Sequence, residues 1–155
     1  MLRFGTLALL LTTFATLSVS VNANDGDRII GLWLTPDDKA TIEITRSGDS
    51  YAGKIIELLE PLYPKDADPA IAGTPKRDQN NLDEALRSRP IIGLNMVHGF
   101  AYVGDGRWEN GRIYDPRDGK EYESEMTLHP DGTLEVRGFI GFSFMGKSQM
   151  WRPRR

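Results

Sequence analysis

The feature of this sequence that most constrains its fold is an alternation of side chains with a period of two. Between Lys120 and Leu128, every second residue from Tyr122 onwards is assigned to a core, and glutamates lie between them. Successive side chains of a β-strand point to opposite faces of its sheet, so this run predicts a half-buried strand. The same reading predicts eight strands, at residues 29–35, 39–46, 51–58, 91–97, 107–114, 120–128, 134–140 and 147–152.

The connections between most of these runs are short and carry turn residues. Asp115–Gly119 and Pro130–Gly132 each combine proline, aspartate and glycine, which suits tight turns between antiparallel strands. Glycines inside the strands mark bends where a sheet curls, and a closed barrel leaves no strand edge exposed. We therefore predict an all-β protein with an antiparallel, roughly eight-stranded barrel, and consider a sandwich the alternative.

One segment interrupts this rhythm. Residues 59–90 comprise 32 residues with five prolines, which is too long for an ordinary connection. We call this segment the insert. Within it, residues 81–87 predict a short helix, with Asn81 as its N-cap and acidic residues in its first turn.

The first 23 residues predict a secretory signal peptide. Arg3 precedes an apolar run from Phe4 to about Val21, and Val21 and Ala23 occupy the small-residue positions of a cleavage site. A membrane anchor is the alternative, but Gly5, the threonines and serines of the run and the lack of a following positive cluster argue against it. We expect residues 24–155 to form a single exported domain.

Composition excludes several classes of site. The chain has no cysteine, so disulfides, thiolate metal sites and a cysteine nucleophile are ruled out, and it has only two histidines. A net charge of −3 argues against nucleic-acid binding. Three glutamates on one strand face, Glu121, Glu123 and Glu125, argue against insertion into a membrane as an outer-membrane barrel. We predict neither a cofactor nor a metal ion.

Two short motifs at the ends of the strand series resemble a known superfamily. Gly31-Leu32-Trp33 opens the first strand and Trp151-Arg152 ends the last. This arrangement resembles the lipocalins and fatty-acid-binding proteins, whose first-strand Gly-x-Trp meets a late arginine at the closed end of the barrel. The resemblance implies that Gly31, Trp33, Trp151 and Arg152 close the barrel, with the Arg152 guanidinium lying flat against an indole.

A second set of motifs runs almost from end to end of the predicted domain. It comprises Gly31-Leu32-Trp33, Gly53-Lys54-Ile55, Asp78 with Asn80, the stretch from Arg87 to Leu94, Trp108 with Gly111, Ile113 to Pro116, Gly119 to Tyr122, Leu134 to Phe139, and Gln149 with Trp151. In order and spacing these resemble the bacterial exported family called domain of unknown function 2147. The resemblance implies a signal peptide, a periplasmic location in Gram-negative bacteria and a lipocalin-like barrel, but it supplies no activity and no catalytic residue.

Two groups of residues are candidates for binding a small ligand. Arginines can hold a carboxylate or phosphate with two hydrogen bonds, and aromatic side chains can line a barrel interior. The candidates are Arg87, Arg89, Asn80, Trp108, Tyr114 and Tyr122. Two alternatives remain open, namely that the arginines pair with Asp78 or Asp83 to fasten the insert, and that the aromatic residues form a packed core.

Two weaker candidates involve titratable side chains. Three acids in seven residues, Asp115, Asp118 and Glu121, have the chemistry of a cation site, although a turn explains them. His98 is the only plausible titrating residue near a barrel rim, and an enzyme hypothesis depends on it alone.

Three functions follow from these candidates. The leading hypothesis is a non-catalytic barrel that binds a small, partly apolar ligand or an envelope component. The second is a filled barrel that binds a protein partner through the insert and an aromatic rim comprising Phe139, Phe142 and Phe144. An enzyme is the third. An empty lumen above about 300 Å³ favours the ligand, and a filled lumen with exposed aromatic residues favours the interaction module.

Overall fold

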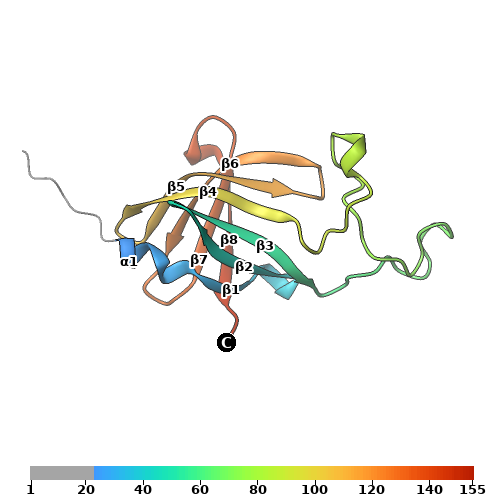
Figure 1. The fold of residues 1–155 in the computed structure, drawn as a ribbon, viewed down its shortest axis with the longest axis horizontal. Coiled ribbons are helices and arrows are strands. Elements are labelled where there is room, and N and C mark those ends of the chain that lie inside the picture. The colour runs from blue at the N-terminus through green and yellow to red at the C-terminus, as the bar shows by residue number, and fades with distance from the viewer. Residues whose placement is uncertain (1–22) are drawn as a thin grey trace, which may run out of the picture.

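The chain folds into a closed antiparallel barrel of eight strands. The computed structural model describes residues 23–155, so residues 1–22 of the predicted signal peptide lie outside the described residues. Each strand pairs with the next in sequence, and β8 pairs with β1 to close the barrel (Figure 1). The strands are β1 (Gly31–Leu34), β2 (Ala40–Ser47), β3 (Ser50–Leu58), β4 (Asn95–Gly104), β5 (Arg107–Asp115), β6 (Lys120–Leu128), β7 (Leu134–Phe139) and β8 (Lys147–Pro153). The predicted all-β barrel of eight strands is confirmed.

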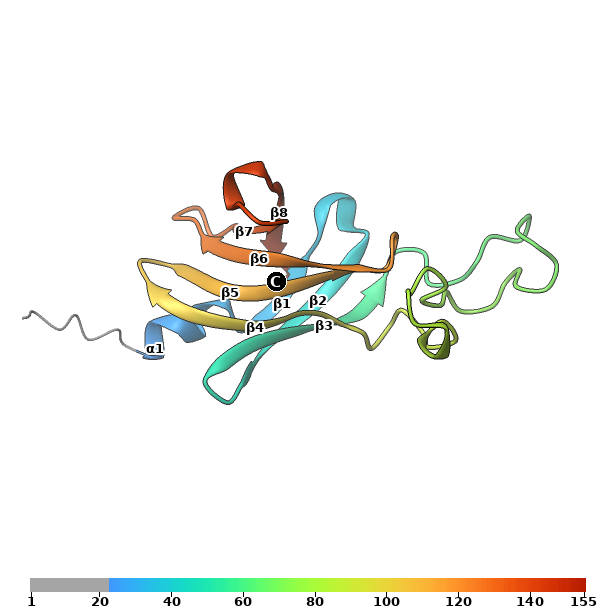
Figure 2. The ribbon, with the colours of Figure 1, turned by 90° about the horizontal axis from the view of Figure 1, so that it is seen from above.

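The two ends of the barrel are covered by different segments. At one end lie α1 (Ala23–Gly26) and the 3-10 turn Asp27–Ile29, and the insert extends from the other (Figures 1 and 2). Ile29 is fully buried, and its carbonyl accepts a hydrogen bond of 2.8 Å from the indole of Trp33. The Tyr51 hydroxyl donates to Asp27 at 2.8 Å. The N-terminal turns therefore seal their end of the barrel. Among residues 23–155, no helix has the length and apolar character needed to cross a membrane.

Side chains fill the lumen of the barrel. The largest fully buried residues are Trp108, Trp151 and Phe100, and they belong to a core of 18 buried apolar residues. Gly111 shows how tight this packing is, because a Cβ at that position would lie 2.4 Å from the Phe100 ring. Such packing is typical of small barrels whose interior is a core instead of a ligand cavity.

The fourth strand differs from its prediction. It was expected at residues 91–97 and runs instead over Asn95–Gly104. Gly93 has φ +99°, which is not extended backbone, and Gly99 has φ +76°. At Gly99 the alternation changes phase, since Val97 and Phe100 are both fully buried although three residues apart. The break in period two hid the second half of the strand from the sequence pattern.

The predicted helix at residues 81–87 is also wrong, because the structure has only the 3-10 turn Glu84–Leu86 there. Side chains compete for the backbone donors that a helix needs. Asn81 Oδ1 accepts from the Asp83 N–H at 2.9 Å, and Asp83 Oδ1 accepts from the Ala85 N–H at 3.0 Å. These two local hydrogen bonds stabilise consecutive tight turns in place of the helix.

Candidate functional site

A buried polar network fastens the insert to the barrel. Asp78 is fully buried within it, although its segment is a loop. Its carboxylate accepts hydrogen bonds from the Tyr114 hydroxyl at 2.6 Å, the Asn81 amide at 2.9 Å and Arg89 Nε at 2.9 Å. Tyr114 belongs to β5, so one side chain of the barrel wall and two side chains of the insert meet at the carboxylate of Asp78. Burial and the neighbouring Asp78 raise the pKa of Tyr114, which keeps its hydroxyl a donor.

The two arginines predicted to bind a ligand are engaged within the insert. Arg89 forms its ion pair with Asp78 at 2.8 Å, and its guanidinium lies 5.6 Å from the centre of the Tyr114 ring. Arg87 donates to the backbone carbonyl of Asn81 at 2.8 Å and pairs with Glu84 at 3.2 Å. These contacts correspond to the alternative in which the arginines fasten the loop, with Asp78 as the partner of Arg89 and Glu84 as that of Arg87.

The other predicted ligand residues also make structural contacts. The Asn80 amide donates to the backbone carbonyl of Arg117, at 3.0 Å, which ties the insert to the β5–β6 turn. Tyr122 is half-buried, and its hydroxyl donates to Asp118. Trp108 is fully buried in the core beside Tyr102, with ring centres 5.0 Å apart. Its indole N–H has no hydrogen-bond acceptor among residues 23–155.

The residues predicted to close the barrel lie at its seam. Trp33 of β1 is in register with Pro153 of β8, and Trp151 is fully buried. The predicted stacking of Arg152 on an indole is absent from the contacts of residues 23–155, because Arg152 pairs with Asp38 in the β1–β2 connection. Gly31, at the start of β1, has φ +142°, a conformation that L side chains rarely adopt, and it is open to solvent where a side chain would be.

The remaining titratable candidates form ordinary surface contacts. His98 lies within β4, not at a rim, and its Nε2 is 2.7 Å from the exposed carboxylate of Glu121. Asp115 pairs with Arg117 at 2.5 Å, and Asp118 accepts from the Lys120 N–H at 3.0 Å. Within residues 23–155, no cluster of acids and histidines has the arrangement of a metal site.

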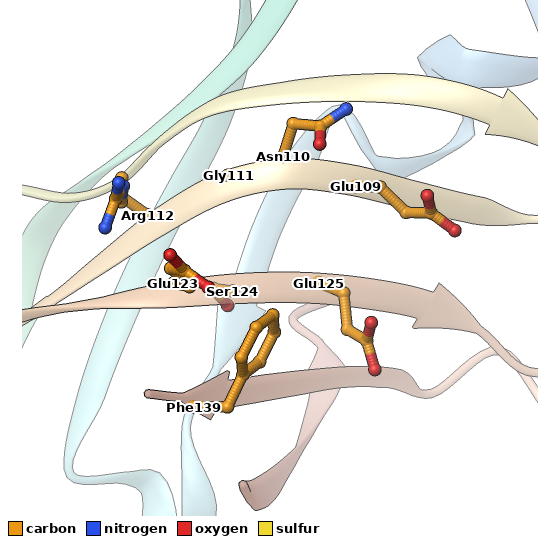
Figure 3. A pocket seen from close by; sticks show the side chains of 8 residues that line it. All are labelled: Glu109, Asn110, Gly111, Arg112, Glu123, Ser124, Glu125 and Phe139. Atoms are coloured by element: carbon orange, nitrogen blue, oxygen red, sulfur yellow. The ribbon is translucent and has the colours of Figure 1, made fainter. Parts of the chain in front are cut away.

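Two hollows open to solvent lie in the described part of the chain, and Trp33 of the core lines one of them. The larger, about 470 Å³, is open and adjoins the start of β1 and the end of β8. The other, about 310 Å³, lies on the outer face of β5, β6 and β7 (Figure 3). We call it the acidic hollow, and its outward side chains are Glu109, Asn110, Arg112, Glu123, Glu125 and Phe139. None of the ligand-binding residues predicted from the sequence lies in it, although the Asn110-Gly111 pair inside a strand is a signal for the bulge that shapes it.

An apolar loop adjoins this hollow. It connects β7 to β8 over residues 140–146, and we call it the β7–β8 loop. Its large apolar side chains are among the most exposed of the described residues, namely Ile140 (77%), Phe142 (65%), Phe144 (77%) and Met145 (72%). The rings of Phe142 and Phe144 stack with centres 5.5 Å apart. The predicted strand at residues 134–140 includes Ile140, but β7 ends at Phe139 and the chain turns outward.

The backbone of the β7–β8 loop is held in place although its side chains are exposed. Arg137 Nε donates to the Ser143 carbonyl at 2.6 Å, and the Gly146 N–H donates to the same carbonyl at 3.0 Å. The Met145 N–H donates to the Phe142 carbonyl at 3.1 Å. Loops with such internal hydrogen bonds present their side chains in a fixed arrangement, which lowers the entropy lost on binding.

Comparisons with known proteins agree with this architecture. Residues 31–153 match the model of a family described as "Uncharacterized protein conserved in bacteria (DUF2147)". Among solved structures, the chain is similar to HP1028 from the human pathogen Helicobacter pylori, a protein described as belonging to the lipocalin family. The two chains are 20% identical, with 82% of this chain and 83% of that chain covered and a TM-score of 0.67, which shows a shared fold. No curated protein matches the chain. The resemblance stated from the sequence is confirmed, and the chain belongs to the bacterial family DUF2147.

Proposed function

We propose that this protein is an exported, non-catalytic interaction module of the bacterial cell envelope, which binds a protein partner through the β7–β8 loop. The observation that carries the proposal is the pairing of a filled lumen with four highly exposed apolar side chains in one short loop. A filled lumen removes the usual site of a small ligand in a barrel. Exposed apolar clusters on a monomer mark interaction surfaces.

The size of the exposed cluster supports binding. Each of the four side chains leaves on the order of 100 Å² of apolar surface in water, and its burial contributes about 2–3 kcal/mol at about 25 cal/mol/Å². Large aromatic residues on a fixed scaffold are the usual centres of binding energy at protein interfaces. The hydrogen bond from Arg137 holds the loop backbone in place, so the loop loses little conformational entropy on association.

A photo-crosslinking experiment tests this proposal. A photoreactive phenylalanine analogue replaces Phe144 in the full chain, which is expressed in its native bacterium, and a second variant carries it in place of Leu82. Leu82 is a matched control, because it is 71% exposed and lies in the insert. We expect a discrete protein adduct at position 144 that disappears in the Phe142→Ser background. Equal adducts at both positions, or none at position 144, would contradict the proposal.

Binding of a small, partly apolar ligand is the second candidate, and one observation favours it. The Trp108 indole N–H is buried in the core without an acceptor among the described residues. An unpaired buried donor costs about 1–3 kcal/mol, and an oxygen atom of a ligand would satisfy it if neighbouring rings moved aside. Native mass spectrometry of the protein from its own cells tests this candidate. We expect a bound mass that is lost in Trp108→Phe, whereas a ligand-free spectrum contradicts it.

A further inference from the structure

We infer that the partner of the β7–β8 loop is a protein segment that carries a lysine or arginine beside apolar residues, and that this basic side chain enters the acidic hollow. The inference rests on the proposed function and adds the chemistry of the partner. It follows from three properties of the surface beside the loop: its continuity with the hollow, its excess of carboxylates over basic side chains and its size.

Phe139 joins the loop and the hollow into one surface. It is the last residue of β7, it lines the hollow, and Ile140 of the loop follows it directly. The other end of the loop lies against the same residue, since a Cβ on Gly146 would be 2.9 Å from Phe139 Cβ. In Figure 3 the Phe139 ring extends from β7 toward the β6 residues of the hollow. A partner that covers the loop therefore reaches the hollow without a gap.

The hollow has an excess of negative charge. Three glutamates and one arginine line it, and Glu109 is paired with Arg107 at 3.3 Å. Glu123 and Glu125 are half-buried, and neither has an ion-pair partner within 4.0 Å among residues 23–155.

The nearest basic residue of β7 does not neutralise these carboxylates. Arg137 is in register with Glu125 in the β6–β7 ladder, but its guanidinium is directed to the loop. There it donates to the Ser143 carbonyl and to the Ser148 hydroxyl, at 2.6 and 2.8 Å. Arg112 lies opposite Glu123 in the β5–β6 ladder, but among residues 23–155 neither carboxylate has a cation within 4.0 Å. A positive charge from a partner would therefore be stabilised beside these two partly desolvated groups.

The dimensions and chemistry of the hollow suit one long basic side chain. Its volume of about 310 Å³ is small for a folded element and sufficient for an extended side chain. The Phe139 ring offers a face for a cation–π contact beside the carboxylates. The bulge in β5, where Asn110 has φ +62°, sets the shape of the neighbouring wall. Apolar residues next to the basic one would then cover Phe142 and Phe144.

Two other occupants of the loop fit these charges less well. An anionic lipid surface would be repelled by the glutamates beside the loop, because such surfaces attract basic patches. In a symmetric dimer the same patch meets itself, so Glu123 and Glu125 would approach their own copies. Both occupants are outcomes of the test.

Selection from a phage-displayed library of random short peptides tests the inference on the full mature chain. We expect enriched peptides in which lysine or arginine adjoins aromatic or aliphatic residues. Fluorescence anisotropy with the best labelled peptide should show affinity about tenfold weaker for Phe144→Ser and for Glu123→Gln/Glu125→Gln. The controls Leu82→Ser and Glu43→Gln alter an equally exposed leucine and an exposed strand glutamate elsewhere, and should leave affinity unchanged. Raising salt should weaken the wild type more than the double glutamine variant.

The outcomes separate this inference from the proposed function. If peptide affinity depends on Phe144 but not on Glu123 and Glu125, the basic partner is refuted and the interaction module is retained. If peptide affinity does not depend on Phe144 either, both proposals are refuted. Flotation with phosphatidylglycerol vesicles that is lost in Phe144→Ser identifies a lipid surface, and a Phe144-dependent dimer in analytical ultracentrifugation identifies a second copy. Either result overturns the inference.

Discussion

Shortening Arg89 to alanine should release the insert from the barrel, and the cost follows from the burial of Asp78. The Asp78 side chain is fully buried, and Nε and Nη2 of Arg89 lie 2.9 and 2.8 Å from its Oδ2. Without the guanidinium, the carboxylate keeps only the neutral donors of Tyr114 and Asn81. Removing one partner of a buried ion pair costs about 3–5 kcal/mol.

The exposure of the arginine reduces this figure. The Arg89 side chain is 38% exposed, so water reaches the space that the alanine leaves, and we expect a loss of about 2–3 kcal/mol. Arg87→Ala is the matched control, because Glu84, its ionic partner, is 83% exposed. Arg87 also loses one hydrogen bond to a carbonyl, so its loss should be about 1 kcal/mol. For a domain of this size, each kcal/mol lowers the Tm by about 3–5 °C.

Urea and thermal unfolding followed by circular dichroism measure both losses. A second change in the same background tests the cause: Asp78→Asn is nearly isosteric and needs no counterion, so Asp78→Asn/Arg89→Ala should be more stable than Arg89→Ala alone. Equal stabilities for Arg89→Ala and Arg87→Ala would refute the role of burial. A double variant no more stable than Arg89→Ala would refute the uncompensated charge as the reason.

Three further changes test the packing of the barrel. Trp33→Ala should lose about 3–5 kcal/mol in urea unfolding, because it removes a buried indole, and a loss below about 1 kcal/mol contradicts its place in the core. Gly111→Ala should cost about 1–3 kcal/mol, since its methyl group meets the Phe100 ring, and an unchanged Tm would mean that the core is looser than described. Burial, and after it the hydrogen bond to Asp27, raises the pKa of Tyr51 to about 12. The protonated Tyr51 hydroxyl therefore contributes its full stabilisation below pH about 10, and this stabilisation is lost as the pH rises toward 12. Unfolding free energies across this range should fall less steeply in Tyr51→Phe than in the wild type.

The barrel was predictable because alternation with a period of two is a direct consequence of strand geometry. Where the backbone departs from that geometry, the prediction failed. At Gly99 the alternation of buried and exposed residues changes phase between Val97 and Phe100, so the period of two does not predict the second half of β4. The helix at residues 81–87 failed for a different reason, since hydrogen bonds from Asn81 and Asp83 to nearby backbone amides are not part of helix periodicity.

The sequence predicts only the aromatic part of the candidate surface. Phenylalanines between two strands are unusual enough to be noticed without a structure, and Phe142 and Phe144 are exposed as expected. Phe139, the third member of the predicted rim, is half-buried at the end of β7. The acidic hollow could not be found in the same way, because its residues come from three strands whose register is set by tertiary pairing. Glu123 faces Phe139 across the β6–β7 ladder, a relation that no local pattern contains.

The architecture itself directs recognition to the outside of this barrel. A closed barrel has no free strand edge, so a partner cannot add a strand to it, and the packed lumen must be disrupted before a ligand enters. The N-terminal turns and the Asp78 network occupy the two ends. The exposed leucines of the insert form two pairs, Leu59 with Leu62 and Leu82 with Leu86, whereas the β7–β8 loop places four apolar side chains within six residues. Binding energy at protein interfaces comes mainly from large side chains that are clustered and held in place. A partner therefore gains the most binding energy at this loop and the hollow beside it.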